Sequence, residues 1–498
     1  MDEIIHYITE KFIKNLSAKV EDFYDSPGEL AEFIINIRNE TDELARRAIQ
    51  TAVQELDVII KGLPARKKKW HVEHKGDGKK LMTSVGEISF KKTLYVSKDE
   101  VDGEGKPLSC YLIDKVLGIA PNQSMTEDAM ANIYEEAVQT SYRKAGELAC
   151  PEGVTKETVK NLLHSTKFPE NFKPPREKRT ARYLYVEADE DHYSLQFNEH
   201  KGDLERGEDG RKLNGAINKI IYVHEGAGPE APKSSRYRLI NAHYFCRGEG
   251  QDNKELWEEV FSYIDATYEM EKIEKLYINA DGAAWIKSGY RSMQGVATFV
   301  LDGFHLSKYV AKMVGHMLDS TEDAKSEIYG CIRDKSKEDF RELVERLKGC
   351  SCMEETQAKI DEAARYIESN WTAAKLRLRR TEGVVGSSTE GHVYHVLSSR
   401  MSTLAMGWSH KGGSQMAHLR EYYYNGGDML ELAKYQKQEL PLAAGAEDAV
   451  LSMNDVLKSE RAHRTKQLAD YGKYAERMSA HLPTQGSKIF MFKLNARL

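Results

Sequence analysis

Three carboxylates stand where predicted strands or helices would hold them rigidly. Asp189 follows the apolar run of residues 182–188 (RYLYVEA), and Asp281 follows residues 275–280, where Gly282 permits a sharp exit into a helix. Glu390 stands at the start of a predicted helix in GSSTEGHVYHVLSSRM. Converging carboxylates suit hard divalent ions such as Mg²⁺ and Mn²⁺. Two such ions, roughly 4 Å apart, can activate a nucleophile and stabilise the leaving oxygen in phosphodiester cleavage and transfer.

Each carboxylate also has an ordinary structural alternative. An Asp at a strand end is commonly a turn former or a helix cap. Asp191 is a rival to Asp189 two residues farther on, although Asp189 directly follows the apolar run. The spacing Ser387-x-x-Glu390 is that of a capping box, in which Glu390 would only begin a helix. The local sequence leaves these alternatives open.

Two further positions have side chains suited to a site for metal or nucleic acid. Asp302-Gly-Phe-His305 follows a predicted strand, and His305 can bind a metal or a phosphate or simply cap the next helix. Trp371 can stack on an unpaired base. Its place on an apolar helical stripe favours packing in a core instead.

The elements around these carboxylates predict one α/β sheet. Trp257, Val260, Phe261 and Ile264 have the spacing of one helical face. The resulting order β-β-β-α-β-α-β fits an RNase H-like sheet, in which the first and fourth strands are neighbours. Asp189 and Asp281 would then project into one crevice. The strands are expected at residues 182–188, 192–197, 219–224, 275–280 and 297–301.

The rest of the chain is predicted to be largely helical, with one small antiparallel sheet. Two apolar stripes, one beginning at Phe340 and one at Ile360, predict a helical block between the α/β sheet and Glu390. Short strand-like runs follow Trp70, and Asp77-Gly78 predicts a hairpin turn between them. The expected regions are an N-terminal helical region (1–62), a small β-rich region (63–122), a helix-turn-helix-like region (123–168), the first part of the RNase H-like core (180–305), an all-α insertion (306–381), the second part of the core (382–425) and a C-terminal helical region (426–498).

The region 123–168 has two interpretations. Thr155 can cap a helix in which Val159 and Leu163 share an apolar face, while Lys160 and Asn161 point elsewhere. That helix is either the DNA-reading element of a helix-turn-helix or one arm of an ordinary helical hairpin.

Composition sets limits on the function. The net charge of −6 argues mildly against a nucleic-acid binder, but basic side chains gather locally. No apolar run reaches the roughly 18 to 20 residues of a membrane span, and the acidic N-terminus is unlike a signal peptide, so a cytosolic protein with reduced cysteines is expected. The clusters are 66–69, the linker with Arg176, Lys178 and Arg179, and the segment with Arg377, Arg379 and Arg380.

The chain resembles a known family in a series of ordered motifs. It is similar to the bacterial insertion-sequence transposases of the ISLre type, a group that is also called an uncharacterised protein family and is related to the Mutator-like and hAT transposases. The resemblance covers about residues 70–482. The motifs that carry it are LMTSVGEISFKKTLY, SYRKAGEL, VTKETVKNLLH, YVEADEDHYSLQ, IIYVHEG, YINADGAAWIKSG, VLDGFH, GSSTEGHVYHVLSSRM and GWSHKGG.

This resemblance implies a fold, a triad and an activity. The fold is an RNase H-like core interrupted by a helical insertion, and the Asp-Asp-Glu triad falls on Asp189, Asp281 and Glu390. The DGFH segment matches the family's C/D-x-x-H signature, which places Asp302 and His305 near the site. The resemblance further implies Mg²⁺ or Mn²⁺, double-stranded DNA with terminal inverted repeats, a target DNA, strand cleavage and transfer, a homodimer or larger assembly, and association with the nucleoid. Two alternatives stay open: a metal-dependent nuclease that does not join ends, and a transposase-derived DNA-binding protein.

Overall fold

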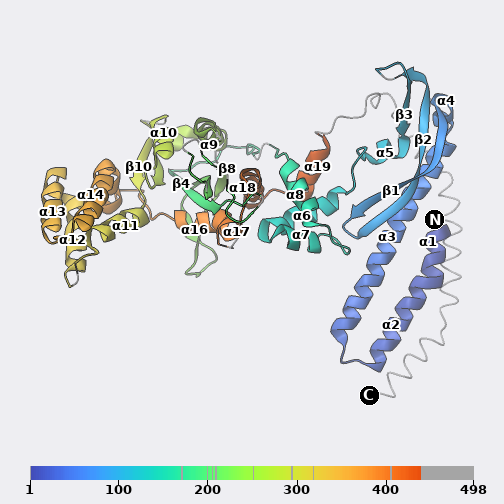
Figure 1. Cartoon of the computed structure of the whole chain (residues 1–498), viewed down its shortest axis with the longest axis horizontal. Coiled ribbons are helices and arrows are strands. Elements are labelled where there is room, and N and C mark those ends of the chain that lie inside the picture. The colour runs from blue at the N-terminus through green and yellow to red at the C-terminus, as the bar shows by residue number, and fades with distance from the viewer. Residues whose placement is uncertain are drawn as a thin grey trace. The chain divides into compact units, whose positions relative to one another are not determined.

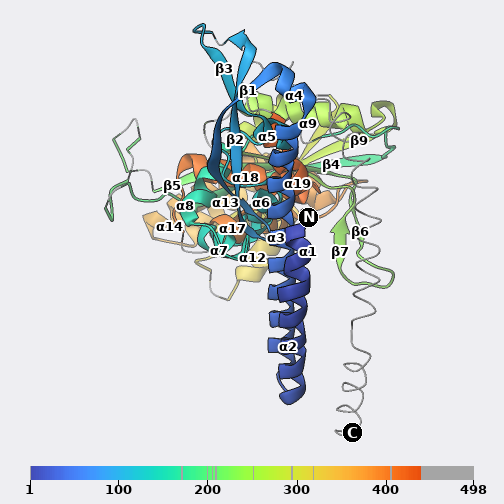
Figure 2. The ribbon, with the colours of Figure 1, turned by 90° about the vertical axis from the view of Figure 1, so that its right-hand side faces the viewer.

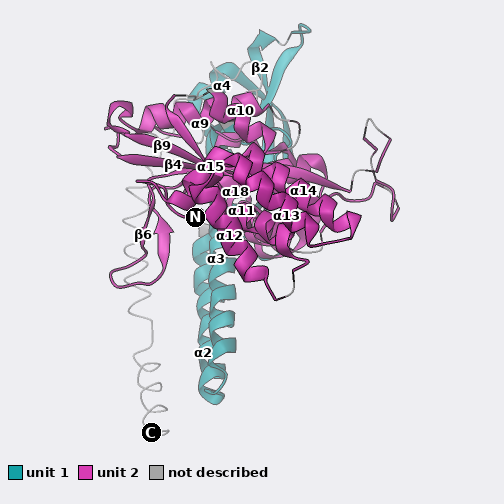
Figure 3. Ribbon diagram, turned by 90° about the vertical axis from the view of Figure 1, so that its left-hand side faces the viewer, with its two compact units in different colours: residues 1–129, 150–152, 437–498 teal, residues 130–149, 153–436 magenta. Residues whose placement is uncertain are grey.

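The computed structural model describes residues 2–438, apart from 102, 170–171, 199, 205, 208–209, 213, 249, 251, 293–294, 318 and 404–405. The chain divides into two compact units, coloured separately in Figure 3. One consists mainly of Met1–Ala129, and the other of Met130–Ala149 and Gly153–Gln436. Most of the region expected at 426–498 lies outside the described residues.

The first unit joins a helical hairpin to a three-stranded antiparallel sheet. Figure 1 shows α2 (Ile13–Asp25) lying along α3 (Leu30–Gly62), and in the view of Figure 2 α2 lies in front of α3. The sheet consists of β1 (Trp70–Thr83), β2 (Gly86–Val101) and β3 (Pro107–Tyr111), in that order. The smaller helices of this unit are α1 (Asp2–Tyr7), η1 (Ile8–Phe12), α4 (Pro64–Lys69) and α5 (Leu112–Leu117).

The predicted small sheet is present, but the predicted hairpin turn is wrong. Strand β1 runs through Asp77-Gly78, with a register irregularity between Lys75 and Asp77, and the tight turn instead joins Thr83 to Gly86. Asp77 accepts a hydrogen bond from Tyr111 of β3 (3.0 Å). Cross-strand pairing therefore overrides the local turn preference of the dipeptide.

Three helices cover the helix-turn-helix-like region: α6 (Glu127–Gln139), α7 (Tyr142–Leu148) and α8 (Lys156–Ser165). Thr155 caps α8, as predicted, because its hydroxyl accepts the backbone N–H of Thr158 (3.2 Å). Val159 and Leu163 are buried on the inner face of α8.

The second unit contains a five-stranded mixed sheet with the order β10-β9-β4-β5-β8. Strands β4, β9 and β10 are parallel, whereas β4 with β5 and β5 with β8 are antiparallel pairs. Helices follow β8 and β9, so the chain order is β-β-β-α-β-α-β. The elements are β4 (Tyr183–Ser194), β5 (Gly215–His224), β8 (His243–Gly248), α9 (Asn253–Thr267), β9 (Lys275–Ala280), α10 (Ala284–Ser292) and β10 (Ala297–Leu301), with a small hairpin of β6 (Ala227–Pro229) and β7 (Tyr237–Leu239) before β8.

The predicted strand set needs correction at two points. The expected strand at 192–197 is wrong, because β4 continues through Asp189 to Ser194 while pairing with β5. Strand β8, absent from the prediction, takes the third place in the order instead. Asp189 therefore lies within a strand and does not end one.

The alternation of side chains along β4 separates a packing face from a polar face. Leu184, Val186 and Ala188 belong to the core with α9 and α10. The odd positions, among them Glu187, Asp189 and Asp191, point to the opposite face because side chains alternate along a strand. That face carries the polar residues discussed below.

A helical block follows β10. Its two predicted apolar stripes, at Phe340 and at Ile360, are buried in one core together with residues of α11 and α12. Figure 1 shows α12, α13 and α14 clustered beyond β10. The helices are α11 (Gly303–Val314), α12 (Thr321–Asp334), α13 (Lys337–Gly349), α14 (Glu354–Ser369) and α15 (Trp371–Arg379).

After the helical block the chain returns to the sheet. A loop leads to α16 (Thr389–Val393), which begins one residue before Glu390 and continues as η3 (Tyr394–Ser398) and α17 (Ser399–Met401). Helix α18 (His410–Tyr424) packs on β8, and α19 (Met429–Gln438) ends the described chain. None of the helices in the described part of the chain has both the length and the apolar character that a membrane crossing needs.

Candidate active site

Asp189 of β4 stands level with Asp281, the first residue after the neighbouring parallel strand β9. Ala188 of β4 pairs with Ala280 of β9, and each Asp is the next residue along its chain. Each carboxylate accepts a backbone N–H close to it in sequence, Asp189 from Glu190 (2.9 Å) and Asp281 from Ala283 (2.8 Å). The two positions are therefore neighbours, as predicted, although Asp189 lies in the middle of a long strand.

Glu390 reaches the same face from the other side of the helical block. Helix α16 has Ser388 as its N-cap and begins with no side-chain capping hydrogen bond, so the capping-box alternative for Glu390 is wrong. The Ser387 hydroxyl is instead close to that of Thr389 (2.6 Å). The side chain of Glu390 is exposed.

A buried carboxylate, Glu187, holds the segment that carries Glu390. Glu187 is 0% exposed and lies two residues before Asp189 on the same face of β4. It accepts hydrogen bonds from the backbone N–H of Ser388 (3.1 Å) and from the hydroxyl of Thr389 (2.7 Å). Burial would raise the pKa of Glu187, but hydrogen bonds from His224, Tyr222 and Thr389 outweigh it and lower this pKa.

The three predicted carboxylates interact electrostatically. Burial raises the pKa of Asp189 to about 7, although the Glu190 backbone hydrogen bond opposes it. The carboxylates of Asp281 and Glu390 raise this pKa further, whereas the imidazole of His305 lowers it. The carboxylates of Asp281 and Glu390 thus lie near Asp189, and clustered carboxylates of this kind are typical of sites that bind a cation.

Asp302 and His305 form a pair beside this cluster. Asp302 caps α11 by accepting the His305 backbone N–H (3.0 Å), and its carboxylate also lies 3.1 Å from Nδ1 of the His305 ring. Burial would raise the pKa of Asp302, but hydrogen bonds from His305 and Ser387 hold it at about 2. The bond to Asp302 raises the pKa of His305 against its burial, and Asp189 and Asp281 raise it further. Asp302 therefore caps α11, and the pair also lies near the carboxylates of Asp189 and Asp281.

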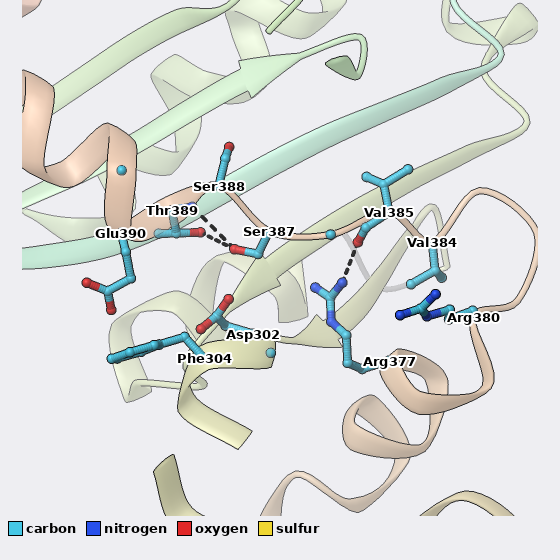
Figure 4. A pocket seen from close by; sticks show the side chains of 13 residues that line it. Asp302, Phe304, Arg377, Arg380, Val384, Val385, Ser387, Ser388, Thr389 and Glu390 are labelled. Atoms are coloured by element: carbon cyan, nitrogen blue, oxygen red, sulfur yellow. Dashed lines mark hydrogen bonds between the residues drawn. The ribbon is translucent and has the colours of Figure 1, made fainter. Parts of the chain in front are cut away.

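A cavity of about 670 Å³ opens next to Glu390. Figure 4 shows Asp302 and Phe304 lying beneath the segment from Ser387 to Glu390, with Arg377 and Arg380 farther along the same wall. Phe304 is 53% exposed, so its ring is accessible from the cavity. The carboxylates of Asp302 and Glu390 and the guanidinium groups of Arg377 and Arg380 line this space, whereas Asp189 and Asp281 do not. Cationic groups and an accessible aromatic ring suit phosphates and bases.

The two arginines of the cavity differ in how firmly their guanidinium groups are held. The guanidinium of Arg377 is tied to the carbonyl of Leu301 (2.8 Å), to the carbonyl of Val385 and to the side chain of Asn279 (3.2 Å). Burial lowers the pKa of Arg377. Arg380 ends α15 in the left-handed conformation (φ 48°) and is exposed. Arg377 therefore shapes the wall, and Arg380 is the one of the two that can turn to a ligand.

Trp371 packs in a core, as its apolar stripe predicted, so the stacking alternative is wrong, and Asp191 does not replace Asp189. Trp371 is 9% exposed and packs against Phe340 (ring centroids 5.3 Å apart) in the helical core, so its ring is not available to a base. Asp191 is buried and accepts hydrogen bonds from Ser398 (2.6 Å) and Ser402 (3.1 Å). Asp191 thus fastens η3 and α17 to the sheet, which leaves Asp189 as the residue level with Asp281.

The remaining basic positions lie apart from the cavity. Arg379 donates a hydrogen bond to the carbonyl of Arg333 in the helical block (2.8 Å). Lys160 of α8 forms an ion pair with Glu157 (2.6 Å), and Asn161 beside it is exposed. Arg176, Lys178 and Arg179 are exposed in the linker before β4.

Two residues of this site are missing from the sequence-based set. Phe304 stands inside the recognised DGFH segment, and only the observed cavity singles it out. Glu187 stands in an apolar run, and the sequence signal for it is a single Glu among apolar residues of a predicted strand. A buried acid in such a run needs hydrogen-bond donors from another part of the chain.

The donors of the triad fit a hard divalent cation in kind, since all are carboxylate oxygens. Within the described ranges, no three His, Cys, Asp or Glu side chains are close enough to hold one ion between them. A bound cation would have to draw Asp189, Asp281 and Glu390 together. It would also relieve the repulsion that raises the pKa of Asp189.

Comparison with known proteins identifies relatives over nearly the whole chain. The model of a family described as "Uncharacterised protein family (UPF0236)" matches residues 27–439. A UPF0236 protein of Caldanaerobacter subterraneus subsp. tengcongensis is 35% identical over 439 residues, which are 88% of this chain and 87% of the relative. A second UPF0236 protein of that organism is 36% identical over 82% of this chain and 81% of its own length. Among solved structures, the Drosophila P element transposase strand transfer complex matches 63% of this chain and 81% of its own chain, at 9% identity and a TM-score of 0.19, which is too low to establish a shared fold.

Proposed function

We propose that this chain, which belongs to the uncharacterised protein family UPF0236, is a DDE-type DNA transposase of the ISLre insertion-sequence type, with an RNase H-like core interrupted by a helical insertion. In this proposal it binds the terminal inverted repeats of its element as a homodimer or larger assembly, then cleaves and transfers DNA strands. Asp189, Asp281 and Glu390 would hold Mg²⁺ or Mn²⁺. The single observation that carries the proposal is the level placement of Asp189 and Asp281 at neighbouring parallel strands, with Glu390 near enough to raise the pKa of Asp189.

The convergence has an identifiable structural basis. Parallel pairing of β4 with β9 sets Asp189 beside Asp281, and hydrogen bonds from Ser388 and Thr389 to Glu187 bring Glu390 to the same face. The carboxylates of Asp281 and Glu390 both raise the pKa of Asp189. When bound, divalent ions supply charge neutralisation at the phosphate and an activated nucleophile.

The chain's other residues have roles in this proposal that follow from their placement. Asp302 holds the His305 ring through Nδ1, which orients the imidazole beside the carboxylates. Arg380, at the far end of the cavity, is placed to contact a DNA phosphate. Phe304 offers an accessible aromatic face on which an unpaired base can stack.

A strand-transfer assay tests the proposal. Purified protein, Mg²⁺, a labelled duplex from each flank of its own gene and a supercoiled target plasmid are incubated, and the products are separated by size. Label joined to the plasmid is the expected result. Cleavage with no joined product would instead identify a nuclease, and binding with neither product would identify a DNA-binding protein. A duplex of scrambled end sequence is the control for specific recognition.

A further inference from the structure

Glu187 forms an unusual hydrogen-bond centre beneath the segment Ser387–Thr389. One of its oxygens accepts the Tyr222 hydroxyl, and the other lies 3.4 Å from Nε2 of His224. The remaining donors come from the segment itself: the backbone N–H of Ser388 and the hydroxyls of Ser387 (3.4 Å), Ser388 (3.5 Å) and Thr389 (2.7 Å). We name this set of contacts the Glu187 anchor.

The anchor connects distant parts of the chain within the second unit. Glu187 and Thr389 are separated by 202 residues, and the whole helical block lies between them in sequence. Hydrogen bonds to a charged acceptor are stronger than those between neutral groups. A carboxylate with 0% exposure depends on such donors because burial has removed its water. The bonds therefore hold the segment tightly while Glu187 stays charged.

The position of the Glu187 anchor on β4 relates the segment Ser387–Thr389 to the triad. Residues two apart on a strand share a face and lie about 7 Å from each other. Glu187 fixes Ser388 and Thr389, and Glu390 is the next residue of the chain. The carboxylate of Glu390 is near enough to Asp189 to raise its pKa. Ser387 also lowers the pKa of Asp302, so the same segment lies close to the Asp302 and His305 pair.

We infer that Glu187 is a positioning residue, which fixes the Ser387–Thr389 segment on β4 so that Glu390 stands beside Asp189. The inference rests on the proposed function for what Glu390 then does. The anchor itself is a property of the protein without metal or DNA. It can therefore be tested separately from the reaction.

Hydrogen exchange measured by mass spectrometry tests the anchor directly. Glu187→Gln keeps the shape of the side chain but removes the charge, and its amide NH₂ faces hydroxyl and N–H donors. Losing bonds to a charged acceptor should make amides of the 385–391 segment exchange about tenfold faster or more. Amides of β9 should be unchanged. Exchange in the segment equal to wild type would overturn the inference.

Glu421→Gln is the matched control. Glu421 is also a buried carboxylate of the second unit, but it accepts the backbone N–H of Cys246 and pairs with Arg247 at strand β8. This variant should lower stability without loosening residues 385–391. If Glu187→Gln does not fold, Thr389→Val removes one donor at nearly constant volume and should loosen the same segment in the same direction. Unchanged exchange in that variant would also overturn the inference.

Mn²⁺ binding, followed by electron paramagnetic resonance of the free ion, separates the anchor from the proposed function. Glu187→Gln should bind Mn²⁺ about 10- to 100-fold more weakly, as when residues that orient metal ligands are lost. Glu421→Gln should bind as wild type does. Equal affinity of wild type and Glu187→Gln would overturn the inference. A wild type that binds no Mn²⁺ would contradict the proposed function, while the exchange data still decide the anchor.

Discussion

Asp189 and Asp281 lie side by side because Ala188 and Ala280, the residues before them, are paired across two parallel strands. Their proximity is therefore set by the last residue pair of β4 with β9, since Asp281 directly follows that pair. Glu390 is held differently, through a segment that hydrogen bonds to Glu187. The site has two rigid members and a third whose position can be altered by mutation.

Removing the charge of Asp189 should stabilise the metal-free protein at high pH. The folded protein holds the proton of Asp189 up to about pH 7, whereas the unfolded chain releases it near pH 3.8. The group therefore costs no stability below pH 3.8, and the cost grows up to pH 7 to at most about 4 kcal/mol. Asp189→Asn should melt above wild type at about pH 8 in chelator, and the difference should shrink toward about pH 4.

Calorimetry with Mn²⁺ completes that test. The ion should raise the melting temperature of wild type but not that of Asp189→Asn, since binding to the folded state alone stabilises it. A variant that melts below wild type at high pH without metal would contradict the placement of Asp189 among like charges.

His305 should influence the pH at which the site accepts metal. Its imidazole lowers the pKa of Asp189, so replacing it leaves the Asp189 proton harder to remove. For His305→Gln we expect the midpoint of Mn²⁺ affinity against pH to move upward. The measurement is Mn²⁺ titration at a series of pH values. A midpoint that stays or moves down would show that the imidazole does not act on Asp189.

Arg380 should contribute one phosphate contact. Because Arg380 has a positive φ, Asn is the suitable replacement, as it tolerates this conformation. Arg380→Asn should weaken binding of end DNA and reduce the slope of log affinity against log salt by about 1. The adjacent Arg379→Ala is the control, because that side chain faces Arg333 in the helical block. Equal salt slopes for the two variants would remove Arg380 from the DNA interface.

Trp371 should matter for stability and not for DNA affinity. Truncating a large buried aromatic side chain leaves a cavity, and Trp371→Ala should cost about 3 to 5 kcal/mol of unfolding free energy. Denaturant unfolding measures this cost, and a gel-shift titration at a temperature where the variant is folded measures DNA binding. A folded variant with several-fold weaker DNA binding would revive a stacking role for the ring.

The sequence analysis anticipated much of the sheet because its strands are apolar and end in recognisable signals. The strands β9 and β10 and the adjacency of β4 and β9 were predictable. The full length of β4 was not, because Asp189, Glu190, Asp191 and His192 are polar, and pairing with β5 is what keeps them in the strand. Strand β8 was not predicted because it is short and has the polar residues His243 and Arg247 near its ends.

The candidate site was predictable in its acids but not in what holds them. A local capping pattern suggested an ordinary role for Glu390, whereas the structure uses Ser387 and Thr389 to reach Glu187. That contact spans the helical block, so no local pattern contains it. Trp371 shows the converse, since its apolar stripe pointed correctly to a core position.

The most direct test of the triad is Mn²⁺-dependent nicking of an end-labelled duplex from the flank of this gene, measured for wild type and Asp281→Asn. Asp191→Asn is the control, because Asp191 lies on the same face of β4 but binds Ser398 and Ser402. We expect nicking by wild type, loss of nicking in Asp281→Asn with end binding retained, and nicking preserved in folded Asp191→Asn. Nicking by Asp281→Asn at the wild-type rate would contradict the assignment of Asp189, Asp281 and Glu390 as the active site.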